Sequence, residues 1–149
     1  MAAFRKLPDV VENESNPIDP AAVAKRLEKN VRLSAYALSL GKIPYVFLLQ
    51  PTLFVTSKKL TQRENKILKK ATEKIAPIKY FSECYKIINE KLPKIGAENF
   101  YYFNMAGIFD GEYKDIFIDS YHFGDRGNEI IANKMYAYLR DIILDTKQK

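Results

Sequence analysis

The sequence has very few of the residues that bind metals or form cross-links. Cys84 is the only cysteine and His122 is the only histidine among 149 residues. A single cysteine excludes an intrachain disulfide and a cysteine-rich metal site. Cys84 lies in a helical pattern, which indicates a small, packed apolar residue. We therefore expect neither a metal nor another cofactor.

Long apolar stretches are also absent. No segment approaches the roughly 20 apolar residues of a membrane span. No apolar run follows the charged residues near the N-terminus, as it would in a signal peptide. We expect neither a membrane span nor a signal peptide in this chain, and nothing in the sequence indicates a compartment.

The composition is that of one globular domain with a positive charge. Apolar residues make up 47% of the chain, and the net charge is +6, carried largely by lysine. Lysines spread along helices usually form a solvated face, whereas a basic patch would favour nucleic acid or another anionic polymer. No RNA-binding motif, zinc-ligand spacing or alternation of basic and aromatic residues supports that second interpretation. We expect no nucleic-acid partner.

The first part of the chain predicts an irregular segment and then a helix. Residues 1–19 are rich in turn formers, with at most a strand stub at Val10-Val11. Asp19 is a good N-cap and Pro20 suits the first helical position, so a helix is predicted from residue 20 to about residue 40. Gly41 is expected to end it.

Two later segments are predicted as strands, with two helices between them. Residues 43–50 are nearly all apolar and precede a proline, which is typical of a strand buried on both faces of a parallel sheet. Residues 99–104 are rich in aromatic strand formers. The first helix starts at Thr61, which has capping-box spacing to Glu64, and runs to about residue 74. The second covers about residues 80–92. Strands that alternate with helices predict a parallel sheet.

A final helix follows the loop at residues 105–115. Asp125 is expected to be its N-cap, and Gly127-Asn128 to open it. Seven apolar residues recur at helical spacing and predict one buried face: Ile130, Ile131, Met135, Tyr138, Leu139, Ile142 and Ile143.

The strongest chemical signal in the sequence is Asp119-Ser120-Tyr121-His122. A spacing of three residues in a loop can bring the Asp119 carboxylate within hydrogen-bonding reach of one imidazole nitrogen of His122. The other nitrogen is then free to take a proton from a nucleophile, as in acyl-transfer triads. The alternative is a surface or capping histidine, because the pattern is short. We predict Asp119 and His122 as catalytic residues.

The stretch resembles the last conserved block of the SGNH (GDSL-type) hydrolases, in which Asp-x-x-His precedes the C-terminal helix. Here the matching residues are Asp119, His122 and Gly127-Asn128, and residues 43–51 are similar to the preceding strand. The resemblance covers roughly residues 20–145. It implies an α/β fold that is part of a three-layer, flavodoxin-like domain, with a small parallel sheet flanked by helices. It also implies a serine esterase or O-deacetylase that acts on a small-molecule or carbohydrate acyl ester.

The sequence departs from that family in its first half. It has no Gly-Asp-Ser, which carries the nucleophile, and no Gly-x-Asn-Asp, which supplies an oxyanion donor. It also lacks a Gly-x-Ser-x-Gly elbow. Ser120 is a poor substitute, because neighbouring loop side chains diverge and such a serine usually makes local hydrogen bonds. Residues 20–149 therefore resemble the C-terminal half of an SGNH domain, and we expect it to be inactive alone.

Two other functions remain open. The chain is a non-catalytic binding or assembly module if the half fold is complete in itself, and an open sheet edge would then favour a homo-oligomer. A basic domain associated with nucleic acid is the third hypothesis, and only the net charge favours it. If the site is catalytic, the loop at residues 107–115 is expected to shape its mouth, with Asn104, Met105 and Phe109 nearby.

Overall fold

The computed structural model describes residues 19–73 and 77–146, with the side chains of the last two of these left aside. The predicted strand stub at Val10-Val11 lies outside the described residues. The elements follow in the order α1 (Pro20–Ser39), β1 (Tyr45–Leu49), α2 (Gln62–Thr72), α3 (Pro77–Lys91), the short 3-10 helix η1 (Leu92–Lys94), β2 (Phe100–Asn104) and α4 (Asp125–Thr146).

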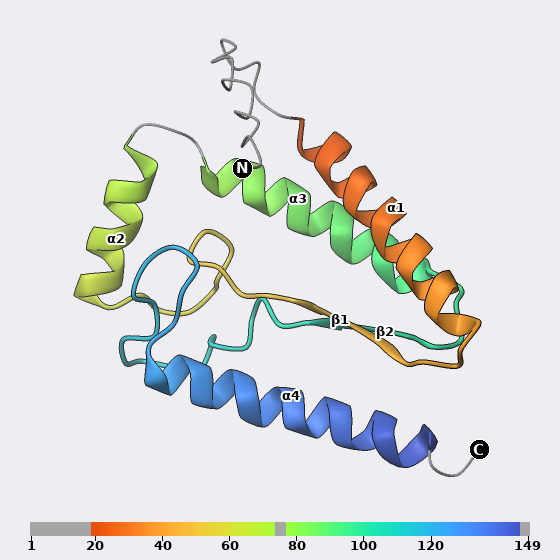
Figure 1. The fold of residues 1–149 in the computed structure, drawn as a ribbon. Helices are drawn as coiled ribbons and strands as arrows, with labels where there is room; N and C mark the ends of the chain where they lie inside the picture. The colour runs from red at the N-terminus through yellow and green to blue at the C-terminus, as the bar shows by residue number, and fades with distance from the viewer. Residues whose placement is uncertain (1–18, 74–76, 147–149) are drawn as a thin grey trace, which may run out of the picture.

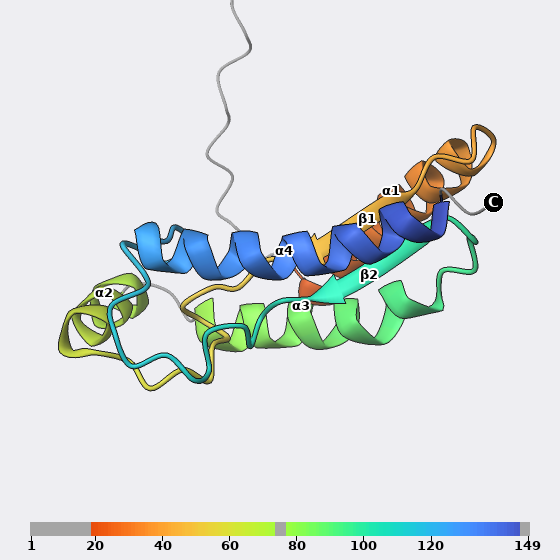
Figure 2. The same ribbon diagram turned by 90° about the horizontal axis from the view of Figure 1, so that it is seen from below.

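The described chain forms an α/β fold in which helices flank a small parallel sheet. Strands β1 and β2 pair in parallel, with Tyr45 opposite Phe100 and Leu49 opposite Asn104. Helices α1 and α3 lie on one face of the sheet and α4 on the other (Figure 1). In Figure 2, which is seen from below, α4 lies in front of β1 and α1. The predicted α/β class and the predicted parallel pairing are therefore confirmed.

The strands are less buried than the sequence predicts. Of the ten strand residues, only Leu49 is buried, and Asn104 is exposed. The prediction of a strand buried on both faces is wrong for most of β1. Within the described residues the sheet has two strands, so each strand has one hydrogen-bonded neighbour and the flanks of its side chains stay accessible.

Helix starts follow the predicted capping chemistry in two places. The Asp19 carboxylate accepts a hydrogen bond from the Ala21 amide at 3.0 Å, with Pro20 in the first turn of α1. Thr61 and Glu64 form the predicted capping box at the start of α2, in which each side chain accepts from the other residue's backbone N–H. Side chains that satisfy the free N–H groups of the first turn fix where a helix begins.

The predicted end of α1 at about residue 40 is confirmed, but two details of the helix termini, at Gly41 and at Asp125, differ from the prediction. Helix α1 ends at Ser39, and the residue in the left-handed region is Lys42, with φ of 52°, not Gly41. The Lys42 and Ile43 amides donate to the carbonyls of Ser39 and Leu38, which is the Schellman pattern of a helix end. Helix α4 begins at Asp125 itself, so Asp125 lies in the first turn and not at the N-cap. A carboxylate in the first turn is still stabilised by the positive end of the helix dipole.

The apolar face of α4 is only partly covered. Ile142 is 6% exposed, whereas Ile143 is 51% exposed and Tyr136 is 68% exposed. The predicted single buried face is therefore wrong for Ile143. Tyr138 stacks on Phe103 of β2, with the ring centroids 3.8 Å apart, and this contact holds α4 against the sheet.

Two apolar clusters hold the layers together. The first joins α1 and α3 to the sheet, and it includes the buried Cys84, as the sequence predicts for that residue. The second cluster lies under the loops beyond the strands and is built on Leu53, Phe109, Ile116 and Phe117. Three phenylalanine rings, those of Phe109, Phe117 and Phe123, meet edge to face in it. This cluster supports the segment that carries Asp119 and His122.

Gly127 allows α4 to approach that cluster closely. A Cβ atom at this buried position would lie 2.8 Å from Phe123 Cβ and 2.9 Å from Ile116 Cγ2. Both distances are too short for carbon atoms, so a larger residue would push the start of α4 away from the loop that carries the candidate site.

None of the helices within residues 19–73 and 77–146 combines the length and the apolar character that a membrane crossing requires.

Candidate functional site

Backbone hydrogen bonds close the loop that carries Asp119 and His122. The Ile118 amide donates to the His122 carbonyl at 3.0 Å, and the Gly124 amide donates to the Ile116 carbonyl at 2.8 Å. Phe117 and Phe123 form an antiparallel bridge and both belong to the second apolar cluster. Both ends of this loop are therefore held in a packed core, only a few residues apart in the sequence.

The same loop is fixed to the segment that follows β1. The Leu53 amide donates to the Ser120 carbonyl at 3.0 Å, and the Gln50 side-chain amide donates to the Tyr121 carbonyl at 3.3 Å. The Tyr121 ring packs against Phe54 and Phe81. The candidate site thus lies beyond the carboxyl end of β1, which is the usual position of ligand sites in open α/β sheets.

A buried ion pair anchors the segment just before the site. Glu64 is fully buried and accepts a hydrogen bond from the ammonium group of Lys58 at 2.6 Å. Its other oxygen accepts from the backbone amides of Ile116 at 2.8 Å and Phe117 at 3.1 Å. Burial alone would raise the pKa of Glu64, but the Lys58 ammonium and the three backbone N–H donors outweigh it and lower the pKa. Glu64 therefore ties α2 to the loop as a carboxylate.

Asp119 and His122 make the contact that their spacing predicts. Asp119 Oδ2 lies 2.7 Å from His122 Nδ1. Asp119 Oδ1 accepts from the backbone amides of Tyr121 at 2.8 Å and His122 at 2.9 Å. Both side chains are exposed, His122 to 73% and Asp119 to 54%. The carboxylate is fixed by the loop backbone as well as by the ring.

These contacts set the protonation of the pair. The backbone amide of Tyr121 first, and then the imidazole and amide of His122, lower the pKa of Asp119 to about 2. Asp119 is therefore ionised at neutral pH, and a carboxylate can only accept hydrogen bonds. It follows that Nδ1 of His122 carries the hydrogen, which leaves the lone pair of the neutral ring on Nε2.

We expect the carboxyl group of Asp119 to titrate near pH 2, and carbon-13 NMR of the side chain measures this directly. Its ordinary pKa is 3.8, so its contribution to stability is complete above that pH and is lost as the pH falls towards 2. In His122→Ala the pKa should rise only in part, because the Tyr121 amide is the largest cause of the shift. Full return to 3.8 in that variant would show that the ring alone holds the carboxylate.

No nucleophilic side chain in the described part of the chain forms a hydrogen bond with His122. Among residues 19–73 and 77–146, no side chain or backbone group donates to or accepts from Nε2 of His122. Ser120 is 9% exposed and makes its hydrogen bond to Leu53 through its carbonyl. The described part of the chain holds no cluster of three histidine, cysteine or acidic residues suited to a metal. Cys84 is buried, its burial raises the pKa of the thiol, and its sulfur lies 3.7 Å from the Pro20 carbonyl oxygen.

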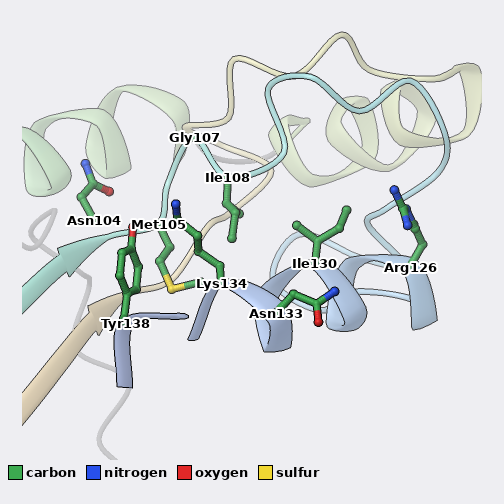
Figure 3. A pocket seen from close by; sticks show the side chains of 9 residues that line it. All are labelled: Asn104, Met105, Gly107, Ile108, Arg126, Ile130, Asn133, Lys134 and Tyr138. Carbon is green, nitrogen blue, oxygen red and sulfur yellow. The ribbon is translucent and has the colours of Figure 1, made fainter. Parts of the chain in front are cut away.

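A pocket of about 660 Å³ lies elsewhere, and neither Asp119 nor His122 lines it. It is formed by the end of β2, the following loop and the first half of α4 (Figure 3). Asn104, Met105 and Gly107 line it, whereas Phe109, expected near the site mouth, is a fully buried core residue. Sequence patterns do not indicate that Arg126 and Lys134 lie at this pocket, because helical spacing marks them only as polar surface.

Comparisons with protein-family models, with curated proteins and with solved structures gave no match to this chain.

Proposed function

We propose that the chain is the C-terminal half of an SGNH-type acyl-ester hydrolase domain, in which His122 is the general base and Asp119 orients it. The observation that carries this proposal is the 2.7 Å contact between Asp119 Oδ2 and His122 Nδ1, with Nε2 unoccupied by any described residue. A carboxylate and an imidazole that it orients, with the second ring nitrogen accessible, are two of the three parts of an acyl-transfer triad.

The arrangement of the strands supports the same proposal. Doubly wound domains of the flavodoxin type have the strand order 2-1-3-4-5, so their last two strands are adjacent and parallel. Strands β1 and β2 are adjacent and parallel, with helices between them in sequence and on both faces. In the described residues no strand pairs with the other edge of β1. That edge is where a strand from the missing half would pair.

In the proposed reaction a serine from outside this sequence attacks the ester carbonyl. Nε2 of His122 takes the serine proton and returns it to the leaving alcohol. It then takes a proton from the water that attacks the acyl-serine and returns it to the serine oxygen as the acid leaves. Asp119 keeps the hydrogen on Nδ1 and stabilises the imidazolium that forms. The backbone amides of Tyr121 and His122 hold the carboxylate in place throughout. The oxyanion donors would come with the serine. Carbohydrate as the alcohol rests on the family resemblance alone.

A second function is a non-catalytic assembly module, which the exposed apolar surface favours. Leu33 and Tyr36 of α1, Leu40 just after it, and Tyr136 of α4 are 48–90% exposed. Such residues and an open strand edge favour association with another chain. A stable dimer of this chain alone, joined through β1 and with unchanged exposure of His122 to solvent, would favour this function over the first.

The isolated chain should hydrolyse an activated aryl acetate no faster than a His122→Ala control. The reason is that the nucleophile and the oxyanion donors are missing, and each such donor is worth about 2–4 kcal/mol of barrier. A longer polypeptide that also carries a Gly-Asp-Ser segment should turn over the ester and react with a fluorophosphonate at that serine. A stoichiometric burst and labelling of the isolated chain would contradict the proposal. So would a longer polypeptide whose serine stays unlabelled although it folds.

A further inference from the structure

The pocket between β2 and α4 carries positive charge that the protein itself does not neutralise. No acidic side chain lines it, and two basic ones do, Arg126 and Lys134. The guanidinium group of Arg126 is already bound by Glu112 at 3.0 Å and Glu129 at 3.1 Å. Lys134 has no carboxylate partner among the described residues, and its ammonium group lies 5.0 Å from the centre of the Tyr138 ring. Among the described lining residues, Lys134 is therefore the cation that has no carboxylate partner.

Asn104 lines the pocket at the same end as Lys134. Asn104 follows β2, and its Oδ1 accepts from the Ala106 backbone amide at 2.9 Å. This bond fixes the orientation of the amide, while Nδ2 has no acceptor within the described part of the chain. In Figure 3 the Lys134 ammonium group lies between Asn104 and Ile108 in the view. In that view the amide oxygen of Asn104 faces Lys134 and Nδ2 points to the far side, so the Lys134 ammonium group is the donor that suits a carboxylate.

The rest of the pocket is apolar. Ile108 and Ile130 lie between Lys134 and Arg126 in Figure 3, one from the loop and one from α4. Met105, which is 3% exposed, also lines the pocket. A volume of about 660 Å³ falls within the range of roughly 300–1,000 Å³ that holds small molecules. A ligand with an anionic head and a short hydrocarbon body would satisfy both parts.

We propose that this pocket binds a short-chain carboxylic acid in its ionised form. The carboxylate lies against the Lys134 ammonium group, and the hydrocarbon chain covers Ile108, Ile130 and Met105. At the other end of the pocket, Arg126 already pairs with Glu112 and Glu129. It therefore binds an added anion less strongly than Lys134 does. This site shares no residue with the Asp119–His122 pair, so it stands whether or not the chain belongs to a hydrolase.

The test is a titration of the full chain with hexanoate, followed by backbone amide shifts in nitrogen-15 NMR. Shifts should concentrate at residues 104–108 and 130–138, and 1-hexanol should bind at least tenfold more weakly. Lys134→Met should weaken hexanoate binding about tenfold or more, because a charged hydrogen bond is lost. Asn104→Asp keeps the acceptor for Ala106 but places a negative charge beside the ligand, and it should weaken binding at least as much.

Two matched substitutions act as controls. Lys86→Met on α3 and Asn30→Asp on α1 make the same chemical changes at exposed positions outside the pocket, and they should leave binding unchanged. The proposal is overturned if hexanoate causes no saturable shifts, or if wild type and Lys134→Met bind it equally. Tighter binding of inorganic phosphate than of hexanoate would also overturn it, because the apolar lining would then contribute nothing.

Discussion

Glu64→Ala should lower the free energy of unfolding by about 3–5 kcal/mol, which is the usual cost of removing one partner from a buried ion pair. The substitution leaves the Lys58 ammonium group buried with only the Lys59 carbonyl as a hydrogen-bond partner. It also removes the acceptor for the Ile116 and Phe117 amides. Because small domains are stable by only about 5–15 kcal/mol, much of the chain should be unfolded at moderate urea concentrations.

Urea unfolding followed by circular dichroism measures this effect. Glu83→Ala on α3 is the matched control, because that glutamate is exposed, and it should change stability by less than about 0.5 kcal/mol. The double variant Lys58→Met with Glu64→Gln removes both charges and should recover more than half of the loss. A loss below about 1 kcal/mol for Glu64→Ala would show that the pair is not an anchor.

The same pair predicts how stability depends on pH. The folded-state pKa of Glu64 is lowered from its ordinary 4.5, so the unfolded chain binds the proton more readily. Its stabilising contribution is complete above pH 4.5 and is lost as the pH falls through the lowered folded value. The difference in stability between wild type and Glu64→Gln should therefore shrink on acidification. If the difference in stability grew towards low pH, Glu64 would be protonated in the folded protein and not ionised.

Local chemistry let the sequence predict much of this arrangement. The capping box of Thr61 and Glu64, the N-cap at Asp19 and the contact of Asp119 with His122 all join residues at most three positions apart. Each therefore depends on short-range backbone geometry that spacing reveals. The alternation of helices and strands likewise predicted the parallel sheet. The flavodoxin-like topology stays a prediction, since β1 and β2 are compatible with it without being specific to it.

Long-range contacts account for what the sequence did not reveal. Glu64 was predicted only as a capping residue, yet it also binds amides at residues 116 and 117. The Gln50 and Leu53 contacts that place the Asp119–His122 loop beyond β1 also join distant segments. Lys134 becomes a pocket residue only because α4 packs beside the end of β2. No periodicity records such neighbours, because each arises from the packing of whole elements.

Two local predictions failed for physical reasons of the same kind. Helix α1 ends where predicted, just before Gly41, but the left-handed residue of its final turn is Lys42 and not the glycine, and the Schellman bonds to Leu38 and Ser39 form there. The apolar run in β1 was expected to be buried on both faces, but a sheet of two strands cannot cover its own flanks. Both errors arise because contacts with neighbouring segments help to decide the conformation and burial of a residue. The preferences of single residues do not include those contacts.

In a polypeptide that also carries the serine segment, His122→Ala should lower kcat by about 10⁴- to 10⁶-fold, with a smaller change in KM. Without Nε2 the serine keeps its proton and the leaving alcohol receives none. Asp119→Asn should cost less, on the order of 10²- to 10⁴-fold. An asparagine there keeps Oδ1 as acceptor for the Tyr121 and His122 amides. Its amide would donate to Nδ1, however, and so force the hydrogen onto Nε2.

The order of these two losses distinguishes a catalytic pair from a structural one. If Asp119 only stabilised the loop, Asp119→Asn would lower the melting temperature and kcat together, and His122→Ala would leave kcat nearly intact. If the pair is catalytic, His122→Ala should keep the wild-type melting temperature, because the exposed ring contributes little packing, while turnover is lost. Asp141→Asn, an exposed change on α4, is the control and should keep both. Equal kcat for wild type and His122→Ala would remove His122 from the mechanism and leave the assembly function as the better account of this chain.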